Sequence, residues 1–493
     1  MSTMEKVTEV ESLKAKIISG QNEVAKKDAL AKGKLTARDR ITTLMDEDSF
    51  VEVGAFVKSR STAFNMEAMQ TPADGVVTGY GTVNGNPVFV YSQDASVMGG
   101  ALGEMHAKKI AKIYDMAMKA GAPIVGFIDT VGVRLQESVD ALEGYGQIYE
   151  KMTEASGYIP QIAVVVGDCA GGSSVFAGLA DFVMMSTKNA RVFLNSPNTL
   201  DEKTATFDNV ASAKVHAQES GLATVIEESE DKLIEDVREL LSYLPQNSEE
   251  DVPYYDTTDD INRVDPALNT FDFDNQKVKV VLASIADNNT YFELNKDYGK
   301  TAVTAFARLD GGTVGVIANN EVRLDYEGVK KITDFVYLCD SFGIPVVSLT
   351  NIEGFESTVA TEKLGIVKAC SEMTRAFASA SIPKINILLN SAFGSSFIMM
   401  NSKALGCDMT YAWPTATVSS LKTESAMKIM YAEELKAGTL TGEAYTEKAE
   451  AYEAVNASAY AAAAKGLVDD IIEPAATRKR VIAALEVLSA NLY

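Results

Sequence analysis

The chain repeats one pattern in its two halves at a nearly constant interval, and this duplication constrains its fold more than any other feature. Each copy contains an apolar strand after Gly-x-Pro, a polar segment with a glycine, a helix, a proline, a second apolar strand and a group of small residues. Corresponding residues are Gly121 and Gly343 (222 apart), Pro160 and Pro383 (223 apart), and Gly172 and Gly394 (222 apart). A long-period duplication of this kind predicts two copies of one domain and two related sites.

The length and the linker composition indicate where the two domains lie. At 493 residues the chain is too long for one ordinary core and sufficient for two. Residues 245–269 are rich in Asp, Glu, Pro, Asn and Tyr and lack periodicity, so we expect domains at 1–250 and 265–493. Alternating strand and helix patterns in both halves predict an α/β fold with helices packed on a sheet.

Local signals predict several individual elements. Asn84-Gly85 and the Asp310–Gly312 segment each separate two apolar runs, as in a β-hairpin. Residues 5–30 read as a charged helix, and Thr36 is a suitable cap for a second short helix. Another predicted helix runs to Lys119, and its lysines at 108, 109 and 112 indicate a solvated face, with a local anion-binding patch as the alternative.

Composition excludes several classes of function. The net charge of −23 argues against nucleic acid and anionic membranes as partners. No apolar run reaches membrane-spanning length and the first residues lack a secretory core, so we expect a cytoplasmic protein. The four cysteines have no paired spacing and are interpreted as buried thiols. His106 and His216 are the only histidines, so we expect no bound catalytic metal and no histidine triad.

The group of small residues at the end of each copy is the candidate chemistry. Cys169-Ala170-Gly171-Gly172-Ser173-Ser174 follows a buried strand and precedes a helix. Glycines at such a junction allow backbone N–H groups to face a cleft, where they would stabilise an oxyanion. One such turn taken alone is better explained by tight packing. Its repetition in the second half, at Gly394-Ser395-Ser396, favours an anion hole in each half.

At these residues the chain resembles the carboxyltransferase subunits of biotin-dependent acyl-CoA carboxylases and decarboxylases. The resemblance covers nearly the whole length and implies a duplicated crotonase-like ββα superhelix with two homologous domains. Its strongest stretches are residues 32–40, 93–112, 121–172, 343–355, 390–414 and 466–481, and they include the only tryptophan, in Tyr411-Ala412-Trp413-Pro414.

The resemblance also implies roles for residues. Gly171-Gly172 resembles the hole that holds the acyl-CoA thioester as its enolate, with Gly132 as a further substrate-binding residue. Ser395-Ser396 resembles the pair that polarises the biotin ureido oxygen, where the family usually has glycine, and Gly394 precedes it. Ile398 resembles a position that shapes the acyl pocket, and a plain core residue is the alternative. The family pattern implies that biotin nitrogen, not a protein side chain, removes the acyl α-proton.

The implied cofactor and partners follow from the same family. They are biotin on a separate biotin carboxyl carrier protein, a coenzyme A thioester as substrate (propionyl/methylmalonyl or acetyl/malonyl), and either a biotin carboxylase subunit or membrane decarboxylase subunits. A homo-oligomer, from dimer to hexamer, is expected, with the first domain of one subunit facing the second domain of another. The segment 426–430 resembles a biotin-attachment hook at Lys428, but its helical setting argues against attachment there.

Two other functions stay open. An acyl-CoA hydratase or isomerase of the same fold would act without biotin, although such enzymes need only one domain copy. A non-catalytic or partner-dependent scaffold subunit of a carboxyltransferase complex is the other alternative, because the usual glycine motifs are altered here.

Overall fold

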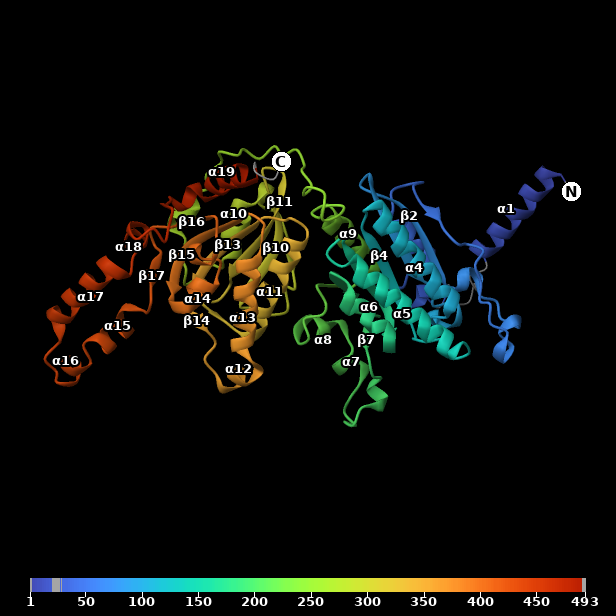
Figure 1. Ribbon diagram of the computed structural model, residues 1–493, viewed down its shortest axis with the longest axis horizontal. Coiled ribbons are helices and arrows are strands. Elements are labelled where there is room, and N and C mark those ends of the chain that lie inside the picture. The colour runs from blue at the N-terminus through green and yellow to red at the C-terminus, as the bar shows by residue number, and fades with distance from the viewer. Residues whose placement is uncertain (1, 20–26, 28, 490–493) are drawn as a thin grey trace. The chain divides into compact units, whose positions relative to one another are not determined.

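The computed structural model describes residues 2–19, 27 and 29–489. The chain divides into two compact units, Met1–Asp251 and Val252–Tyr493. Each unit is built on its own mixed sheet with its own helices (Figure 1). The charged segment expected at 5–30 begins with α1 (Thr3–Ser19), and its residues 20–26 and 28 lie outside the described residues.

The first unit contains a sheet in the order β1-β2-β3-β4-β5-β6-β8, with β7 pairing on β5. Its strands are β1 (Val51–Glu52), β2 (Val76–Val83), β3 (Asn86–Gln93), β4 (Ile124–Thr130), β5 (Gln161–Ala170), β6 (Phe182–Ser186), β7 (Arg191–Phe193) and β8 (Val225–Glu227). Its further helices are α3 (Ala37–Leu44), α4 (Glu104–Ala120), α5 (Ser138–Ala155), α6 (Ser174–Leu179), α7 (Phe207–Val210), α8 (Ala213–Gln218) and α9 (Glu230–Leu241). β3, β4, β5 and β6 are parallel, so α4 and α5 are crossovers.

The second unit repeats this arrangement with the order β18-β16-β15-β13-β11-β10-β9, with β17 pairing on β15 and β12 on β14. Its strands are β9 (Tyr291–Leu294), β10 (Ala302–Leu309), β11 (Gly312–Asn319), β12 (Arg323–Leu324), β13 (Val346–Ile352), β14 (Gly354–Phe355), β15 (Lys384–Phe393), β16 (Met409–Ala412), β17 (Thr417–Ser419) and β18 (Asp470–Ile471). Its helices are α10 (Lys279–Ile285), α11 (Tyr326–Ser341), α12 (Val359–Leu364), α13 (Ile366–Ser379), α14 (Gly394–Met399), α15 (Thr423–Met430), α16 (Ala432–Lys436), α17 (Gly442–Asn456), α18 (Ala459–Ala464) and α19 (Thr477–Ser489).

Each unit buries its own apolar core against the sheet. In the first, α4 and α5 lie side by side and bury residues such as Ile110, Ile113 and Ile148 against β4 and β5 (Figure 1). In the second, α10 and α19 contribute Val281 and Val481 to a core with β13 and β15. Continuous burial along the central strands is what parallel strands covered on both faces require.

Several predicted elements are present as expected. Asn84-Gly85 joins β2 to β3, and both residues have positive φ. Residues 310–311 join β10 to β11 in the same way. Thr36 caps α3 in a capping box with Asp39, whose backbone N–H lies 3.1 Å from Thr36 Oγ1.

A buried lysine occurs at matching positions of the two units. In the first unit it corrects the expectation that the lysines of α4 form a solvated face. Lys109 on α4 is buried rather than solvated, and its ammonium donates to the carbonyls of Ala73 (2.8 Å) and Val76. Lys331, at the equivalent position on α11, donates to three carbonyls at 2.8–3.0 Å. Burial lowers the pKa of each ammonium to about 8. The neighbouring Lys108 is exposed and pairs with Glu104.

Candidate functional site

The first candidate turn stands where β5 ends and α6 begins. Gly171, Gly172 and Ser173 form a single 3-10 turn between them, and Gly171 has a φ of +59°. A residue that carries a side chain rarely adopts this left-handed backbone conformation, which is why glycine is suited to the position. The first N–H groups of a helical segment have no acceptor within it, so the amides of this turn are available to a negatively charged oxygen.

A group of aromatic side chains supports this turn from α5. Tyr149 Oη donates to the carbonyl of Gly172 at 2.7 Å, and Tyr145 Oη lies 2.8 Å from Ser173 Oγ. Both rings contact Phe176 on α6, with centroid distances of 5.7 and 5.5 Å. These tyrosines were not predicted from the sequence, although their spacing of four residues on a predicted helix places them on one face.

Gly132 lies directly against the first turn. Its φ is +108°, and a Cβ there would come within 3.3 Å of the carbonyl oxygen of Ala170, the last residue of β5. Thr130 Oγ1 accepts the Gly132 N–H at 3.1 Å and holds the loop in place. The structure therefore brings together the three glycines selected in the first half, Gly132, Gly171 and Gly172.

A buried ionic network fixes the loop that carries Gly132. Arg134 is fully buried and donates to Asp74 at 2.7 Å and to Glu137 at 2.9 Å. His106 is buried beside it and contacts the Asp74 carbonyl at 3.0 Å and Gln93 Nε2 at 3.2 Å. Burial and the charge of Arg134 hold the pKa of His106 well below its usual value, so the imidazole is neutral and occupied by structural contacts.

The second candidate turn stands at the junction of β15 and α14. Gly394 has a φ of +61° and directly follows the last strand residue, Phe393, as Gly171 follows Ala170. Ser395 is exposed. Ser396 is buried, and its hydroxyl donates to the carbonyl of Phe393 at 2.7 Å.

The strand ends correct the pairing of the two turns by one position. β4 and β13 begin at Ile124 and Val346, an interval of 222, whereas β5 and β15 begin at Gln161 and Lys384, an interval of 223. Gly394 is therefore the counterpart of Gly171, Ser395 that of Gly172, and Ser396 that of Ser173. The pairing of Gly394 with Gly172 inferred from a constant interval is wrong, because one extra residue lies between β13 and β15.

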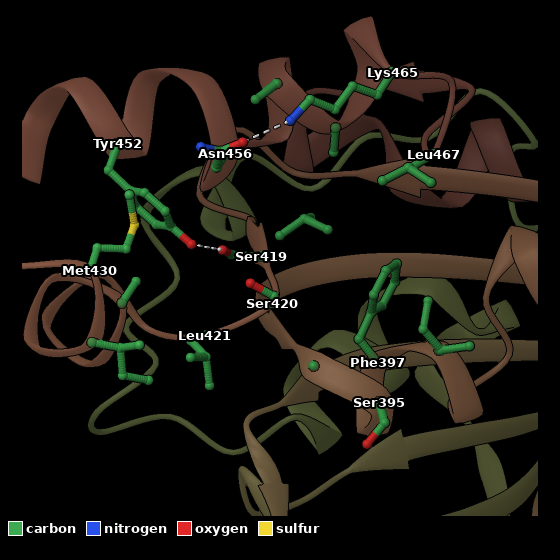
Figure 2. Close-up of a pocket in the computed structure, with 17 residues that line it drawn as sticks. Ser395, Phe397, Ser419, Ser420, Leu421, Met430, Tyr452, Asn456, Lys465 and Leu467 are labelled. Carbon is green, nitrogen blue, oxygen red and sulfur yellow. Dashed lines mark hydrogen bonds between the residues drawn. The ribbon is translucent and has the colours of Figure 1, made fainter.

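A cavity of about 890 Å³ opens beside the second turn. Figure 2 shows Ser395 and Phe397 on one side of it and Tyr452, Asn456 and Lys465 on the helices opposite. Ile398, which is 38% exposed, also lines it, so its side chain is not a plain core residue. Most of the remaining lining is apolar and comes from β17, α15, α18 and the segments that follow β17 and α18, namely Val418, Leu421, Ala426, Ile429, Met430, Ala461, Ala462 and Leu467.

Two pairs of polar side chains that line this cavity contact each other. Ser419 Oγ lies 3.1 Å from Tyr452 Oη, and Lys465 Nζ donates to Asn456 Oδ1 at 3.1 Å (Figure 2). An apolar hollow with a few oriented polar groups is typical of a site for a small organic molecule. Its lining belongs to the second unit throughout.

The structure also bears on the remaining expectations from composition. The four cysteines are free and buried, as predicted. Within the described part of the chain, no three His, Cys, Asp or Glu side chains gather closely enough to hold a metal ion. Over residues 2–19, 27 and 29–489, no helix combines the length and the apolar character needed to cross a membrane.

Comparison with known proteins identifies the family. The model of the carboxyl transferase domain matches residues 28–492. The chain belongs to the carboxyl transferase family. It is 39% identical to methylmalonyl-CoA decarboxylase subunit alpha of Veillonella parvula, over 99% of this chain and 97% of that protein. It is 38% identical to the methylmalonyl-CoA carboxyltransferase 12S subunit of Propionibacterium freudenreichii subsp. shermanii, over 99% and 95%.

Solved structures of the carboxyl transferase family agree with this fold. Transcarboxylase 12S, a hexamer solved with methylmalonyl-coenzyme A and methylmalonic acid bound, superposes with a TM-score of 0.93. That superposition covers 99% of this chain and 97% of the other at 36% identity. The prediction of a duplicated crotonase-like α/β fold is confirmed.

Proposed function

We propose that the chain is the carboxyltransferase subunit that moves a carboxyl group between carboxybiotin on a separate carrier protein and the α-carbon of a short-chain acyl-CoA. The observation that carries this proposal is the pair of left-handed glycine turns, one at the end of the equivalent strand in each unit. The near full-length similarity to methylmalonyl-CoA decarboxylase and carboxyltransferase subunits supports a propionyl/methylmalonyl substrate, with acetyl/malonyl as the alternative.

The two turns have different tasks in this proposal. Gly171 and Gly172, with Gly132 against them, hold the thioester oxygen and stabilise it as the enolate forms. Gly394 and Ser395, followed by Ser396, hold the ureido oxygen of biotin. Substitution of glycine by serine leaves the backbone N–H groups in place, so a hole of this kind tolerates it.

The cavity of the second unit fits a biotin head group. Its volume of about 890 Å³ lies in the range of small-molecule sites, and its wall is apolar beside the hydroxyl-bearing turn. Biotin on its carrier supplies the carboxyl group and, once this has left, a nitrogen that accepts the acyl α-proton. The residues of the chain orient the two reactants and exclude water, and the neutral, hydrogen-bonded His106 takes no part in proton transfer.

Assembly with a second copy is part of the same proposal. In the first unit, Val131, Leu135, Val139 and Leu142 are exposed apolar residues on and just before α5. In the second unit, Val359, Leu364 and Val367 are exposed on α12 and α13. Apolar patches of this kind mark interaction surfaces. They support a homo-oligomer in which the first unit of one copy meets the second unit of another.

The partners in the proposal are a biotin carboxyl carrier protein with either a biotin carboxylase or membrane decarboxylase subunits, in the cytoplasm.

A carboxyl-transfer assay tests the activity. Purified protein is incubated with free biotin and methylmalonyl-CoA labelled with ¹³C in its free carboxyl group, and in parallel with labelled malonyl-CoA. We expect label on biotin and an equal amount of propionyl-CoA or acetyl-CoA. If a carrier-borne biotin also receives no label, the scaffold alternative is correct. Hydration or isomerisation without biotin would contradict the proposal.

A further inference from the structure

The turn of the first anion hole receives little steric support from its own residues. A Cβ placed on Gly171 would meet no atom within 4 Å, and Gly172 follows directly. Glycine has the most mobile backbone of all residues, so two in sequence leave the orientation of their amides loosely defined. An oxyanion hole, however, works because its donors are fixed before the charge develops. The backbone N–H of Ser174 closes the turn on the carbonyls of Gly171 and Gly172, and side-chain donors can fix these peptide planes further.

Two hydroxyl groups hold the peptide planes on either side of Gly172. Ser174 Oγ donates to the Gly171 carbonyl at 2.7 Å, and this carbonyl shares a peptide plane with the Gly172 N–H. Tyr149 Oη donates to the Gly172 carbonyl, also at 2.7 Å, and this carbonyl shares its plane with the Ser173 N–H. With both planes held, neither dihedral angle of Gly172 is free to drift.

The phenol of Tyr149 is itself firmly placed. Its ring packs edge-on against Phe176 and lies 6.1 Å from the ring of Tyr145. Burial raises the pKa of the Tyr149 hydroxyl, so it remains a donor across the neutral range. The bond to Gly172 spans 23 residues of sequence, unlike the local bond that Ser174 makes within its own turn.

The second turn is held in another way. Ser395 stands where the first turn has Gly172, and its Cβ restricts the backbone directly. Among the described residues, the structure records no side chain bonded to the Ser395 carbonyl. The tyrosine support is therefore particular to the half that we assign to the acyl-CoA.

We infer that Tyr149 is a positioning residue of the acyl-CoA half-site, acting through the Gly172 carbonyl to fix the amides that bind the thioester oxygen. This inference rests on the proposed function, because it assigns the first turn to the thioester. Tyr145 stands one step further away, since its hydroxyl reaches Ser173 Oγ rather than a peptide group of the turn.

Tyr149→Phe tests the inference because it removes only the hydroxyl group. We expect kcat of carboxyl transfer to fall about five- to tenfold, the usual effect of one lost hydrogen bond, with KM for the acyl-CoA within about twofold. Tyr158→Phe is the matched control, since it removes a phenol hydroxyl that lies just after the same helix and has no hydrogen-bond partner among the described residues. Thermal unfolding of both variants is measured alongside.

A spectroscopic measurement separates positioning from a merely structural role. Propionyl-CoA labelled with ¹³C at the thioester carbon is bound to each protein without biotin, and the carbonyl stretch is recorded by infrared difference spectroscopy. We expect a lower frequency than in solution for the wild type and Tyr158→Phe, and a smaller shift for Tyr149→Phe. An unchanged band together with unchanged kcat in Tyr149→Phe would overturn the inference. A wild-type band equal to that in solution would instead remove the thioester from this turn and with it the proposed half-site.

Discussion

At the scale of single residues, the two turns differ most at the position after the left-handed glycine. Gly172 occupies it in the first unit and Ser395 in the second. A Cβ on Gly172 would lie 3.0 Å from Tyr149 Oη and 3.2 Å from Tyr145 Cε1, so a side chain there meets the tyrosines. A larger residue at 172 therefore acts by displacing the support of the turn, and not by filling the space of the thioester oxygen.

Gly172→Ala follows from this geometry as a prediction. The added methyl group lies closer to Tyr149 Oη than a normal contact, so the hydroxyl has to move by a few tenths of an ångström. We expect a weaker bond to Gly172, a fall in carboxyl transfer no larger than that of Tyr149→Phe, and a free energy of unfolding lower by about 1–3 kcal/mol. In a Tyr149→Phe background the closest contact is absent. The same substitution should then cost at least about 0.5 kcal/mol less, measured by denaturant unfolding of all four proteins. Additive effects would show that the methyl group does not press on Tyr149.

Some residues of the site could be predicted from the sequence and others could not. Gly132, Gly171, Gly172 and Gly394 stand out because glycine just past a buried strand usually serves a backbone conformation or a close approach that other residues cannot adopt. Tyr149 could not be predicted, because its hydrogen bond joins residues 23 positions apart and no local sequence pattern indicates such a bond. The interval of 223 residues between Pro160 and Pro383 already indicated one extra residue in the second copy. With that residue counted, Ser395 corresponds to Gly172.

At the scale of elements, the buried lysines of α4 and α11 show why a helix face cannot be assigned from charge alone. Lys108 and Lys109 are neighbours in sequence, but only Lys109 faces the start of β2, where carbonyls need donors. Hairpins and helix caps depend on adjacent residues and were predictable. The burial of Lys109 depends on tertiary packing, which the sequence pattern does not reveal.

Lys109→Met should lower stability and change its pH dependence. Its loss removes a donor from the carbonyls of Ala73 and Val76, of which Ala73 keeps the bond from the Val76 N–H, and this costs about 1–3 kcal/mol. The ammonium has a pKa of about 8 in the folded protein and its ordinary value of 10.5 when unfolded. Between these values the unfolded chain holds a proton that the folded protein has released, so the free energy of unfolding rises with pH in this window.

Urea unfolding at several values between pH 7.5 and pH 10 measures this contribution. We expect the rise to be smaller in Lys109→Met than in the wild type, while Lys331 contributes equally to both. Lys108→Met, at the exposed neighbouring position, is the matched control for the removal of a lysine. An identical slope in all three proteins would mean that Lys109 is charged to the same extent in the folded and unfolded chain.

At the scale of the whole molecule, the two repeated units carry turns that differ in their residues and in their surroundings. One turn has paired glycines supported by tyrosines, and the other has serines beside a large apolar cavity. The duplication and the α/β class were evident from spacing and strand patterns. We propose that the half-sites combine through association between copies, and the exposed apolar residues of α5 and α13 support this proposal.

Complementation between two inactive variants tests most directly whether one site is assembled from unlike turns on different copies. Gly172→Val disrupts the first turn. Ser395→Pro removes one amide donor of the second, at an early helix position that tolerates proline. The two chains carry different tags, are co-expressed, and are purified by both tags in turn. Each variant alone should be inactive, and mixed dimers should recover about half of the wild-type carboxyl transfer, since one of two sites then has both turns intact. Doubly tagged oligomers with no transfer would contradict a site shared between copies.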